Sequence, residues 1–577
     1  MHDRFFIAAA LREIGRLLVI KGENPFRARA YEQAASMLER LDEDLGRMIK
    51  QRQLTRISGI GPALAAVIEE LYLTGESALL ERLRAELPPG VVELSDIPGL
   101  SLKKIVALHN ALGIGSVAEL RAACEKGLVR RIKGFGEKTE AKILQAIQER
   151  ETRPEQSLLH RALAESERLL AYLRADATVT QAEAAGALRR RRELVSRIRL
   201  VAASREPQAV VQYFSRLPGA AVTGMTRDAC QIRLANGLPV DLVTVDPEHF
   251  ANSLHYFTGS QKHRARLEEI AASKGLSFEP QGLRPNNGKK VSIQTEEDIY
   301  RHLSMQYVPP ELREDTGEIE AALSGALPGL VNEEEIRGVV HCHTVYSDGK
   351  NTIEEMARAA DRLGMRYLTI TDHSPSAFYA RGVKIDRLKA QWDEIARVQE
   401  QSRVKLLRGT ESDILDDGAL DYPDAVLEKF EVIIASIHVR SGMGPGPMTR
   451  RLVQAMKWPF VKIWGHPLGR LLLSRAPLEC AVEEVLDAVA ASPALIEVNG
   501  DPRRLDLEPR WIRVARERGI KFVVSSDAHS VDTLQNFRYG VAMARRGWLR
   551  RADVVNTMDT DDFMNAVRPL QTQRAKS

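Results

Sequence analysis

The stretch IRGVVHCHTVYSDG (336–349) begins a series of short apolar runs, each of which ends in a potential metal ligand. The later runs are YLTITDH (367–373), KLLRGTE (405–411), EVIIASIH (431–438), VKIWGH (461–466) and FVVSSDAH (522–529). Segments of helix length separate consecutive runs. This alternation is typical of a β/α barrel, whose strand ends converge on one face. The sequence therefore predicts a barrel with metal ligands at that face.

Imidazoles and carboxylates stand at the ends of these runs, and the candidates are His341, His343, Asp348, His373, Glu411, His438, His466, Asp527 and His529. Nine candidates are too many for one ion, so the pattern implies a cluster. Residues two apart at a strand end point to the same side, as His341 and His343 would. Mixed imidazole and carboxylate ligands suit Zn²⁺, Mn²⁺ or Fe²⁺, among which the sequence does not choose.

Composition bounds the remaining possibilities. A chain of 577 residues is too long for one core, so we expect three or four domains. No apolar run reaches the ~18 residues that a membrane span needs, and the charged first helix does not resemble a signal peptide. Four cysteines favour a reducing cytoplasm over a disulfide framework. The net charge is only +4, so any DNA binding must come from local patches.

Three segments of the helical first 150 residues resemble one another: 54–71, 94–112 and 129–147. Each has an apolar residue, a glycine-containing turn and an amphipathic helix, whose free N–H groups suit a phosphate. They resemble the helix-hairpin-helix motif, which binds the DNA backbone without sequence preference. The candidate DNA-binding residues are Gly59, Gly61, Gly99, Gly134, Gly136, Lys103, Lys104 and Lys138. Ordinary packing turns in a helical domain are the alternative interpretation.

From residue 1 to about 315 the chain resembles a bacterial family X DNA polymerase. The resemblance rests on the hairpin repeats and on NPFRARAYEQAA (24–35), AGALRRRRE (185–193), YFTGSQKH (256–263) and EEDIYRHLSMQYVPPELRED (296–315). In that family a helical DNA-binding domain precedes a palm and a thumb. The palm carries a Gly-Ser turn for the triphosphate, an Asp-x-Asp pair on a strand, and a third Asp on a neighbouring strand.

The sequence departs from the polymerase pattern at the catalytic residues of the palm. The two metal-binding aspartates fall on Arg197 and Arg199, and the serine of the turn falls on Ala187 beside Gly186. Only the third carboxylate, Asp241, is in place. Two-metal phosphoryl transfer needs carboxylates, whereas two guanidinium groups add permanent cations that repel the ions. We therefore predict that the palm binds no Mg²⁺ and does not polymerise; a DNA polymerase with residual activity is the alternative.

Two interpretations of the palm arginines remain open. Arg189–Arg192, Arg197 and Arg199 would form a cationic groove that grips a DNA backbone, because guanidinium groups suit bidentate phosphate contacts. The alternative is that these arginines pair with acidic neighbours and keep a relict fold in solution.

From about 337 to 570 the chain resembles the PHP (polymerase and histidinol phosphatase) domain. The resemblance rests on HCHTVYSDG (341–349), TDHS (371–374), GTESDI (409–414), ASIHVRSG (435–442), WGHPLGR (464–470) and SDAHS (526–530). It implies a distorted seven-stranded β/α barrel with up to three metals. One metal would take His341, His343, Glu411 and Asp527. A second would share Glu411 and take His438 and His466, and a third would take Asp348, His373 and His529.

Arginines that follow strands at the metal face are candidate phosphate clamps, with rim salt bridges as the alternative. They are Arg440, Arg470 and Arg504, and we count them with Glu411 and Asp527 as candidate catalytic residues. Clustered divalent ions make a bound water acidic and neutralise charge on a phosphoryl group, so phosphoester hydrolysis is the natural reaction.

The expected architecture is multidomain α/β. It comprises a helix-hairpin-helix region (1–150), a palm (151–245), a thumb (246–315), a linker (316–336) and the PHP barrel (337–577). The resemblances imply a bacterial, cytoplasmic, nucleoid-associated monomer that acts on gapped, nicked or 3′-ended DNA.

Three functions remain open. The first is a DNA repair nuclease, a 3′–5′ exonuclease or 3′-end-processing enzyme with possible abasic-site cleavage. The second is a small-molecule phosphatase like the histidinol phosphate branch of the barrel family. The third is a DNA-binding scaffold without catalysis, which the complete ligand set argues against.

Overall fold

The computed structural model describes residues 4–569, except 40–44, 58, 89, 96, 98–99, 153–155, 235, 286–290 and 440–441. The chain divides into two compact units, Met1–Glu155 and Gln156–Ser577. Among the described residues, no helix combines the length and the apolar character needed to cross a membrane.

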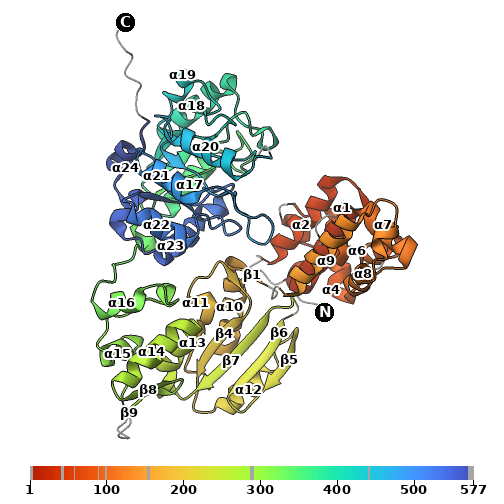
Figure 1. The fold of residues 1–577 in the computed structure, drawn as a ribbon. Coiled ribbons are helices and arrows are strands. Elements are labelled where there is room, and N and C mark those ends of the chain that lie inside the picture. Colours follow the sequence, from red (N-terminus) through yellow and green to blue (C-terminus); the bar gives the residue numbers. More distant parts are fainter. Residues whose placement is uncertain are drawn as a thin grey trace. The chain divides into compact units, whose positions relative to one another are not determined.

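The first unit is built of helices (Figure 1). They are α1 (Arg4–Lys21), α2 (Pro25–Glu39), α3 (Leu45–Lys50), α4 (Pro62–Thr74), α5 (Ala78–Glu86), α6 (Val91–Ser95), α7 (Leu102–Leu112), α8 (Val117–Glu125) and α9 (Glu137–Thr152). Leu11, Ile14 and Leu18 of α1 are fully buried. Their spacing of three and four residues places them on one face of the helix, which packs into the core of this unit.

Two of the three hairpins have the same local structure. Each begins with a short 3₁₀ turn, which is followed by a glycine and then by a long helix. The turn is Leu54–Arg56 before α4 and Val129–Arg131 before α9. Gly59 and Gly134 have φ of 86° and 95°, a conformation that favours glycine. Gly99 of the middle hairpin lies outside the described residues.

The palm is a five-stranded sheet flanked by α10 (Leu159–Arg174), α11 (Gly186–Arg189) and α12 (Pro207–Phe214). In spatial order its strands are β2 (Gln181–Ala185), β4 (Ile198–Ala203), β7 (Pro239–Val245), β6 (Ala229–Leu234) and β5 (Ala220–Met225). The pair β4–β7 is parallel and the other pairs are antiparallel. Arg199 stands directly opposite Asp241 in this register. A small separate pair joins β1 (Ser157–Leu158) to β3 (Leu194–Val195).

The thumb follows the palm within the same unit. It contains α13 (Phe250–Thr258), α14 (Gln261–Ser273), α15 (Glu296–His302) and a hairpin of β8 (Leu276–Glu279) and β9 (Gly282–Pro285). Its core includes Leu267, Phe278, Ile299 and Tyr300.

The segment 316–336, which we expected to be a linker, is packed: its first part joins the thumb core, and Val331 and Ile336 join the core that contains the barrel. It forms α16 (Glu318–Leu323), and Ile319, Leu327 and Leu330 join the thumb core together with Trp548 of the barrel. Glu318 is fully buried, with an oxygen 2.6 Å from Nδ1 of His263. Apolar residues at regular spacing and a buried charge partner therefore override the polar, glycine-containing composition that suggested a linker.

The rest of the second unit is a parallel barrel. Its strands are adjacent in sequence order: β10 (Gly338–Val339), β11 (Tyr367–Ile370), β12 (Lys405–Asp413), β13 (Val432–Ser436), β14 (Ile463–Trp464), β15 (Leu495–Asn499) and β16 (Phe522–Ser525). A bridge between Cys342 and Ala528 joins the chain after β10 to the chain after β16. The predicted barrel of seven strands is confirmed, and it is nearly closed.

Helices cover the outside of the barrel (Figure 1). They are α17 (Ile353–Arg362), α18 (Ile385–Gln399), α19 (Asp424–Leu427), α20 (Pro445–Met456), α21 (Val482–Ala490), α22 (Pro509–Glu517), α23 (Phe537–Arg546) and α24 (Thr560–Val567). Phe563 of α24 stacks on Tyr367, the first residue of β11, at 4.4 Å between ring centroids. This contact places α24 at the amino-terminal ends of the strands, which leaves the carboxyl ends for the ligands.

Candidate metal centre

The nine candidate ligands converge at the carboxyl ends of the barrel strands. Glu411, near the end of β12, lies at the middle of the group. Its Oε2 is 2.9 Å from Nδ1 of His373 and 3.3 Å from Nε2 of His341. Its Oε1 is 2.8 Å from Nε2 of His466 and 3.3 Å from Nε2 of His438. One carboxylate therefore faces imidazoles from four different strand ends.

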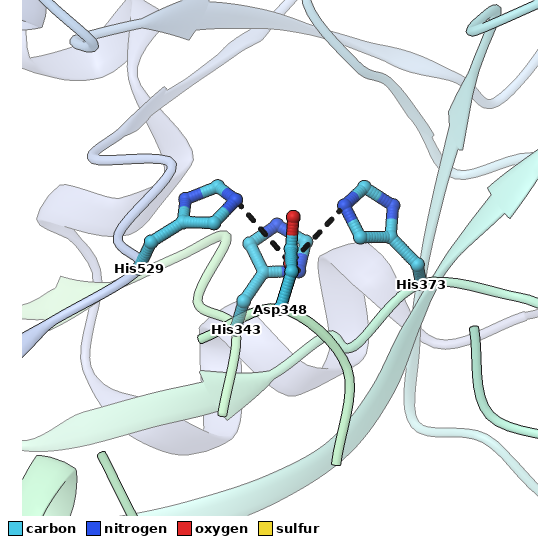
Figure 2. A group of neighbouring side chains, drawn as sticks. All are labelled: His343, Asp348, His373 and His529. Carbon is cyan, nitrogen blue, oxygen red and sulfur yellow. Dashed lines mark ion pairs between the residues drawn. The ribbon is translucent and has the colours of Figure 1, made fainter. Parts of the chain in front are cut away.

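A second group comprises His343, Asp348, His373 and His529 (Figure 2). Asp348 Oδ1 stands between His373 and His529, 3.6 Å and 3.5 Å from their Nε2 atoms. The ring of His343 stacks between the same two histidines, with centroids 4.3 Å from each. His343 also points its Nε2 toward Asp527 Oδ1, at 3.4 Å, and so connects the two groups.

The centre fits metal ions because its inward atoms lack other partners. Among the described residues, several ligand atoms are buried and make no hydrogen bond: Nε2 of His341 and His438, both ring nitrogens of His343, Nδ1 of His373, Oδ1 of Asp348 and Oε1 of Glu411. Buried polar atoms are rarely left without partners, and such a concentration needs an explanation. Cations that accept these lone pairs would supply it, and imidazole with carboxylate is a suitable donor set.

Hydrogen bonds on the far side of three rings orient them toward the centre. Nδ1 of His341 lies 2.5 Å from Oε1 of Glu497, and Nδ1 of His438 lies 3.1 Å from Oδ1 of Asp413. Nδ1 of His529 lies 3.0 Å from the carbonyl oxygen of Asp527. Partners of this kind fix the tautomer and leave Nε2 free to bind a metal.

Glu497 and Asp413 were not predicted from the sequence. Each lies two residues from another polar residue near a strand end, Asn499 and Glu411, and alternation along a strand returns it to the same face. Tyr379 was also missed, and its ring lies 6.3 Å from that of His373 and 6.2 Å from that of His438. Burial, and then Glu411 and Asp413, raise the pKa of Tyr379. Nothing in the sequence marks a loop tyrosine as part of the site.

Three of the ligands have left-handed backbone. His341, His466 and Asp527 have φ of 66°, 23° and 47°, which is strained for residues with a Cβ atom. The neighbouring Gly465 is also constrained, because a Cβ there would lie 2.2 Å from Oγ of Ser436. The chain therefore turns sharply at the strand ends and directs these side chains inward.

Charges in the centre shift one another's pKa values. Burial lowers the pKa of His343, and the neighbouring His529 and His373 lower it further, to about 3. Burial also disfavours a protonated His438, but Glu411 and Asp413 outweigh it and raise that pKa to about 10. A cation at His438 would therefore displace a proton.

The three candidate clamp arginines differ in their surroundings. Arg504 reaches the centre, with Nε 3.2 Å from Oδ2 of Asp527. Arg470 is buried and donates instead to the carbonyl oxygens of Arg504 and Leu505. Arg440 lies outside the described residues.

In the palm, Arg197 and Arg199, at the expected aspartate positions, both approach the carboxylate of Asp241. Arg197 Nη1 lies 2.6 Å from Oδ1 of Asp241, and Arg199 Nη2 lies 3.6 Å from its Oδ2. Gly186, with φ of 65°, lies against the Cβ of Arg199, and Ala187 follows it in α11. The only one of the three expected carboxylates that is present is thus paired with guanidinium groups.

The cationic groove is smaller than the arginine run suggested. Arg189 pairs with Glu296 at 2.7 Å, and Arg190 pairs with Glu314 at 2.9 Å. These two arginines are therefore paired with carboxylates of the thumb region, as the alternative interpretation of the arginine run expects.

The candidate DNA-binding lysines lie at the hairpin helices. Lys103 and Lys138 are exposed in the first turns of α7 and α9. Lys104 lies over the ring of Phe135 at 5.9 Å, so it also covers apolar surface. Gly61 and Gly136 leave open space where a Cβ would be, as close approach of a backbone requires.

Family models match most parts of the chain. They describe a helix-hairpin-helix domain at residues 4–77, a SAM-like helix-hairpin-helix tandem at 91–149, a DNA polymerase beta thumb at 253–314 and a PHP domain at 340–499.

Whole-chain similarity is broader than any of these models. The chain is 34% identical to the DNA polymerase/3'-5' exonuclease PolX of Bacillus subtilis over 567 residues. This alignment covers 97% of this chain and 98% of that protein. A probable phosphatase of Thermoanaerobacter is 29% identical over 229 residues, 38% of this chain and 89% of its own length. A probable phosphatase of Caldanaerobacter subterraneus is 31% identical over 206 residues, 33% of this chain and 74% of its own.

Proposed function

Because this chain belongs to the family X DNA polymerases with a C-terminal PHP domain, we propose that its barrel hydrolyses DNA phosphodiesters, as a 3′–5′ exonuclease or in the processing of 3′ ends. The observation that carries the proposal is the convergence of nine candidate ligands, six of which have inward atoms that are buried and make no hydrogen bond to any described residue: His341, His343, Asp348, His373, Glu411 and His438. The relative that matches along the whole chain is itself named a 3'-5' exonuclease.

Three divalent ions are proposed for the centre. His341, His343, Glu411 and Asp527 would hold the first, and Glu411, His438 and His466 the second. Asp348, His373 and His529 would hold the third, and the close approach of these three residues supports that assignment. When bound, such ions supply Lewis acidity and lower the pKa of a coordinated water.

Side chains of the protein would balance charge, orient the ligand rings and bind the phosphate. Glu411 faces imidazoles with both oxygens and would balance the charge of metal ions bound there. Glu497 and Asp413 keep the rings of His341 and His438 in one tautomer. Arg504 offers guanidinium N–H groups beside Asp527, where they would bind a phosphate oxygen and stabilise the charge that develops during hydrolysis.

We further propose that the palm has lost polymerase activity. The sequence resemblance implies that Arg197 and Arg199 replace metal-binding carboxylates of the family, and both approach Asp241. A divalent ion would have to displace them and tolerate two fixed cations nearby. The helix-hairpin-helix region would hold DNA by its backbone, through the helix N-termini that carry Lys103 and Lys138.

A small-molecule phosphatase is the second candidate, because the barrel alone resembles probable phosphatases. A front half with two helix-hairpin-helix regions favours DNA as the substrate, since a phosphomonoesterase needs no grip on a nucleic-acid backbone.

One gel tests the proposal. The wild type, His341→Ala/His343→Ala and Arg197→Asp/Arg199→Asp would be incubated with Mn²⁺ and a labelled gapped primer–template, with and without dNTPs. The wild type is expected to shorten the primer and never to extend it, and the histidine variant to do neither. Extension by the wild type would contradict loss of the polymerase site, and shortening by the histidine variant would exclude the barrel as the nuclease.

Faster turnover of a generic monoester than of the oligonucleotide would favour the phosphatase.

A further inference from the structure

A buried carboxylate of the palm pairs with two arginines of the barrel. Glu193, directly before β3, has Oε2 2.5 Å from Nη1 of Arg546 and Oε1 3.5 Å from Nη2 of Arg470. The side chains of Glu193, Arg470 and Arg546 are only 13%, 8% and 6% exposed. Burial alone would raise the pKa of Glu193, but Arg546 and Arg470 outweigh it and hold the pKa at about 2. This contact is therefore a charged one that solvent screens little.

The guanidinium of Arg470 also holds a turn of the barrel. Its Nε donates to the carbonyl oxygen of Arg504 at 2.9 Å, and its Nη2 donates to that of Leu505. Its Nη1 lies 3.5 Å from Oε1 of Glu508. Leu505 has φ of 44°, a conformation that a leucine keeps only when its surroundings impose it.

The held turn carries the arginine that reaches the metal centre. Arg504 points its Nε at Oδ2 of Asp527, 3.2 Å away. Within the described part of the chain, its Nε and Nη1 are buried and make no hydrogen bond. Arg504 therefore keeps Nη1 as an available donor beside a predicted metal ligand, and its backbone is fixed by Arg470.

We propose that Glu193 and Arg470 are positioning residues of the phosphoesterase: the palm carboxylate orients Arg470, Arg470 fixes the 504–505 turn, and Arg504 is thereby aimed at the phosphate of the substrate. This inference rests on the proposed hydrolysis of phosphodiesters. It gives the palm a use that does not depend on polymerisation, because the palm supplies one support of the neighbouring active site.

The test is a double-mutant cycle between the palm and the barrel. Glu193→Gln keeps the shape of the side chain and removes its charge, and Arg504→Ala removes the proposed phosphate contact. The matched control is Glu183→Gln, an exposed palm glutamate that pairs only weakly, with Arg174 at 3.3 Å. Each variant of the full-length protein, loaded with Mn²⁺, would be assayed for kcat and KM on a 3′-labelled oligonucleotide. Its affinity for inorganic phosphate, its manganese content and its thermal unfolding would also be measured.

Glu193→Gln is expected to lower kcat/KM and phosphate affinity by about tenfold, the lower end of the range for supporting contacts around a metal site. Its manganese content should match that of the wild type, because no ligand is touched. In the double variant Glu193→Gln/Arg504→Ala the loss should equal that of Arg504→Ala alone, since both changes act through one contact. Glu183→Gln should behave as wild type.

Several outcomes would overturn the inference. Additive losses in the double variant would show that Glu193 does not act through Arg504. Loss of manganese from Glu193→Gln would indicate a general structural role. If Glu193→Gln is unfolded at the assay temperature, Glu193→Asp replaces it, and the same non-additivity is required. Inactivity of the wild type on the oligonucleotide would refute the proposed function. The phosphate affinities of the single and double variants would still show whether Glu193 and Arg504 are coupled.

Discussion

The imidazole of His341 lies between carboxylates on both sides. Glu497 lies 2.5 Å from its Nδ1, and Glu411 lies 3.3 Å from its Nε2. Glu497 also accepts the backbone N–H of His466 and an N–H of Asn499. A single carboxylate behind the centre thus sets the orientation of two ligands, and its own charge makes His341 a better donor to a cation.

Replacing Glu497 with glutamine tests this support. The amide has the same shape but no charge, and it can present a donor to Nδ1, which would move the ring proton to Nε2 and block coordination. We expect Glu497→Gln to weaken metal affinity by about 10- to 100-fold. Competition with a chromogenic chelator measures this affinity. Glu517→Gln, on exposed surface of α22, is the control, and equal affinity in both variants would contradict the support role.

Individual residues also mark what the sequence could and could not predict. The nine candidate ligands could be selected because they lie at or just beyond the ends of apolar runs and each has a chemistry that metals use. The contacts of Arg470 could not be predicted from the sequence, because a guanidinium at a strand end can equally bind a phosphate or hold the backbone. Its carbonyl partners at positions 504 and 505 become apparent only in the folded chain.

At the scale of elements, the two hairpins that carry Lys103 and Lys138 present a helix N-terminus and an exposed lysine in the same place. Lys103 lies in the first turn of α7 and Lys138 in the first turn of α9. Free N–H groups and a nearby cation suit a phosphate, and this geometry does not read the base sequence.

The salt dependence of DNA binding tests these helices. Lys103→Ala/Lys138→Ala should weaken binding equally for unrelated DNA sequences. It should also reduce the slope of log K against log salt concentration by about 0.9 for each phosphate that the lysines no longer neutralise. Fluorescence anisotropy with labelled gapped DNA at several salt concentrations measures both quantities. Lys50→Ala, at the end of α3, provides the control, and an unchanged slope in the double variant would refute a role for these lysines in binding phosphate.

Elements with a clear periodicity were predictable from the sequence and others were not. The barrel strands could be predicted, because they are mostly buried, largely apolar runs between helices. The edge strand β5 was missed, since its largely exposed residues show no apolar alternation. The segment 316–336 was misjudged because its composition is that of a linker, while its packing depends on partners in the thumb and on Trp548.

At the scale of the whole molecule, ion pairs join the palm to the thumb. Glu296 of α15 accepts two hydrogen bonds from Arg189 of the palm, at 2.7 Å and 2.8 Å, and two from Arg313, at 2.9 Å and 3.4 Å. Arg313 is fully buried. Burial alone would raise the pKa of Glu296, but Arg313 and Arg189 lower it well below its ordinary value.

Acid should therefore separate these parts. Because the folded pKa of Glu296 is depressed, its contribution to stability is present above the unfolded value of 4.5 and is lost as pH falls toward the folded pKa. Glu296→Gln should flatten this dependence and destabilise the fold by about 3–5 kcal/mol at neutral pH, because Arg313 is left buried without its charge partner. Thermal unfolding at a series of pH values measures both effects. Glu297→Gln, its exposed neighbour, should change neither, and a wild-type pH profile in Glu296→Gln would contradict the assignment.

The buried palm–barrel contact has a practical consequence for anyone who studies the barrel in isolation. A fragment that begins at residue 337 lacks Glu193 and Glu311, which pair with Arg470, Arg546 and Arg545. It also exposes Trp548, which packs in the thumb core. The cut would create a basic surface with an aromatic residue in it, a combination that attracts single-stranded nucleic acid. Binding of DNA by such a fragment would therefore measure the truncation and not the native protein.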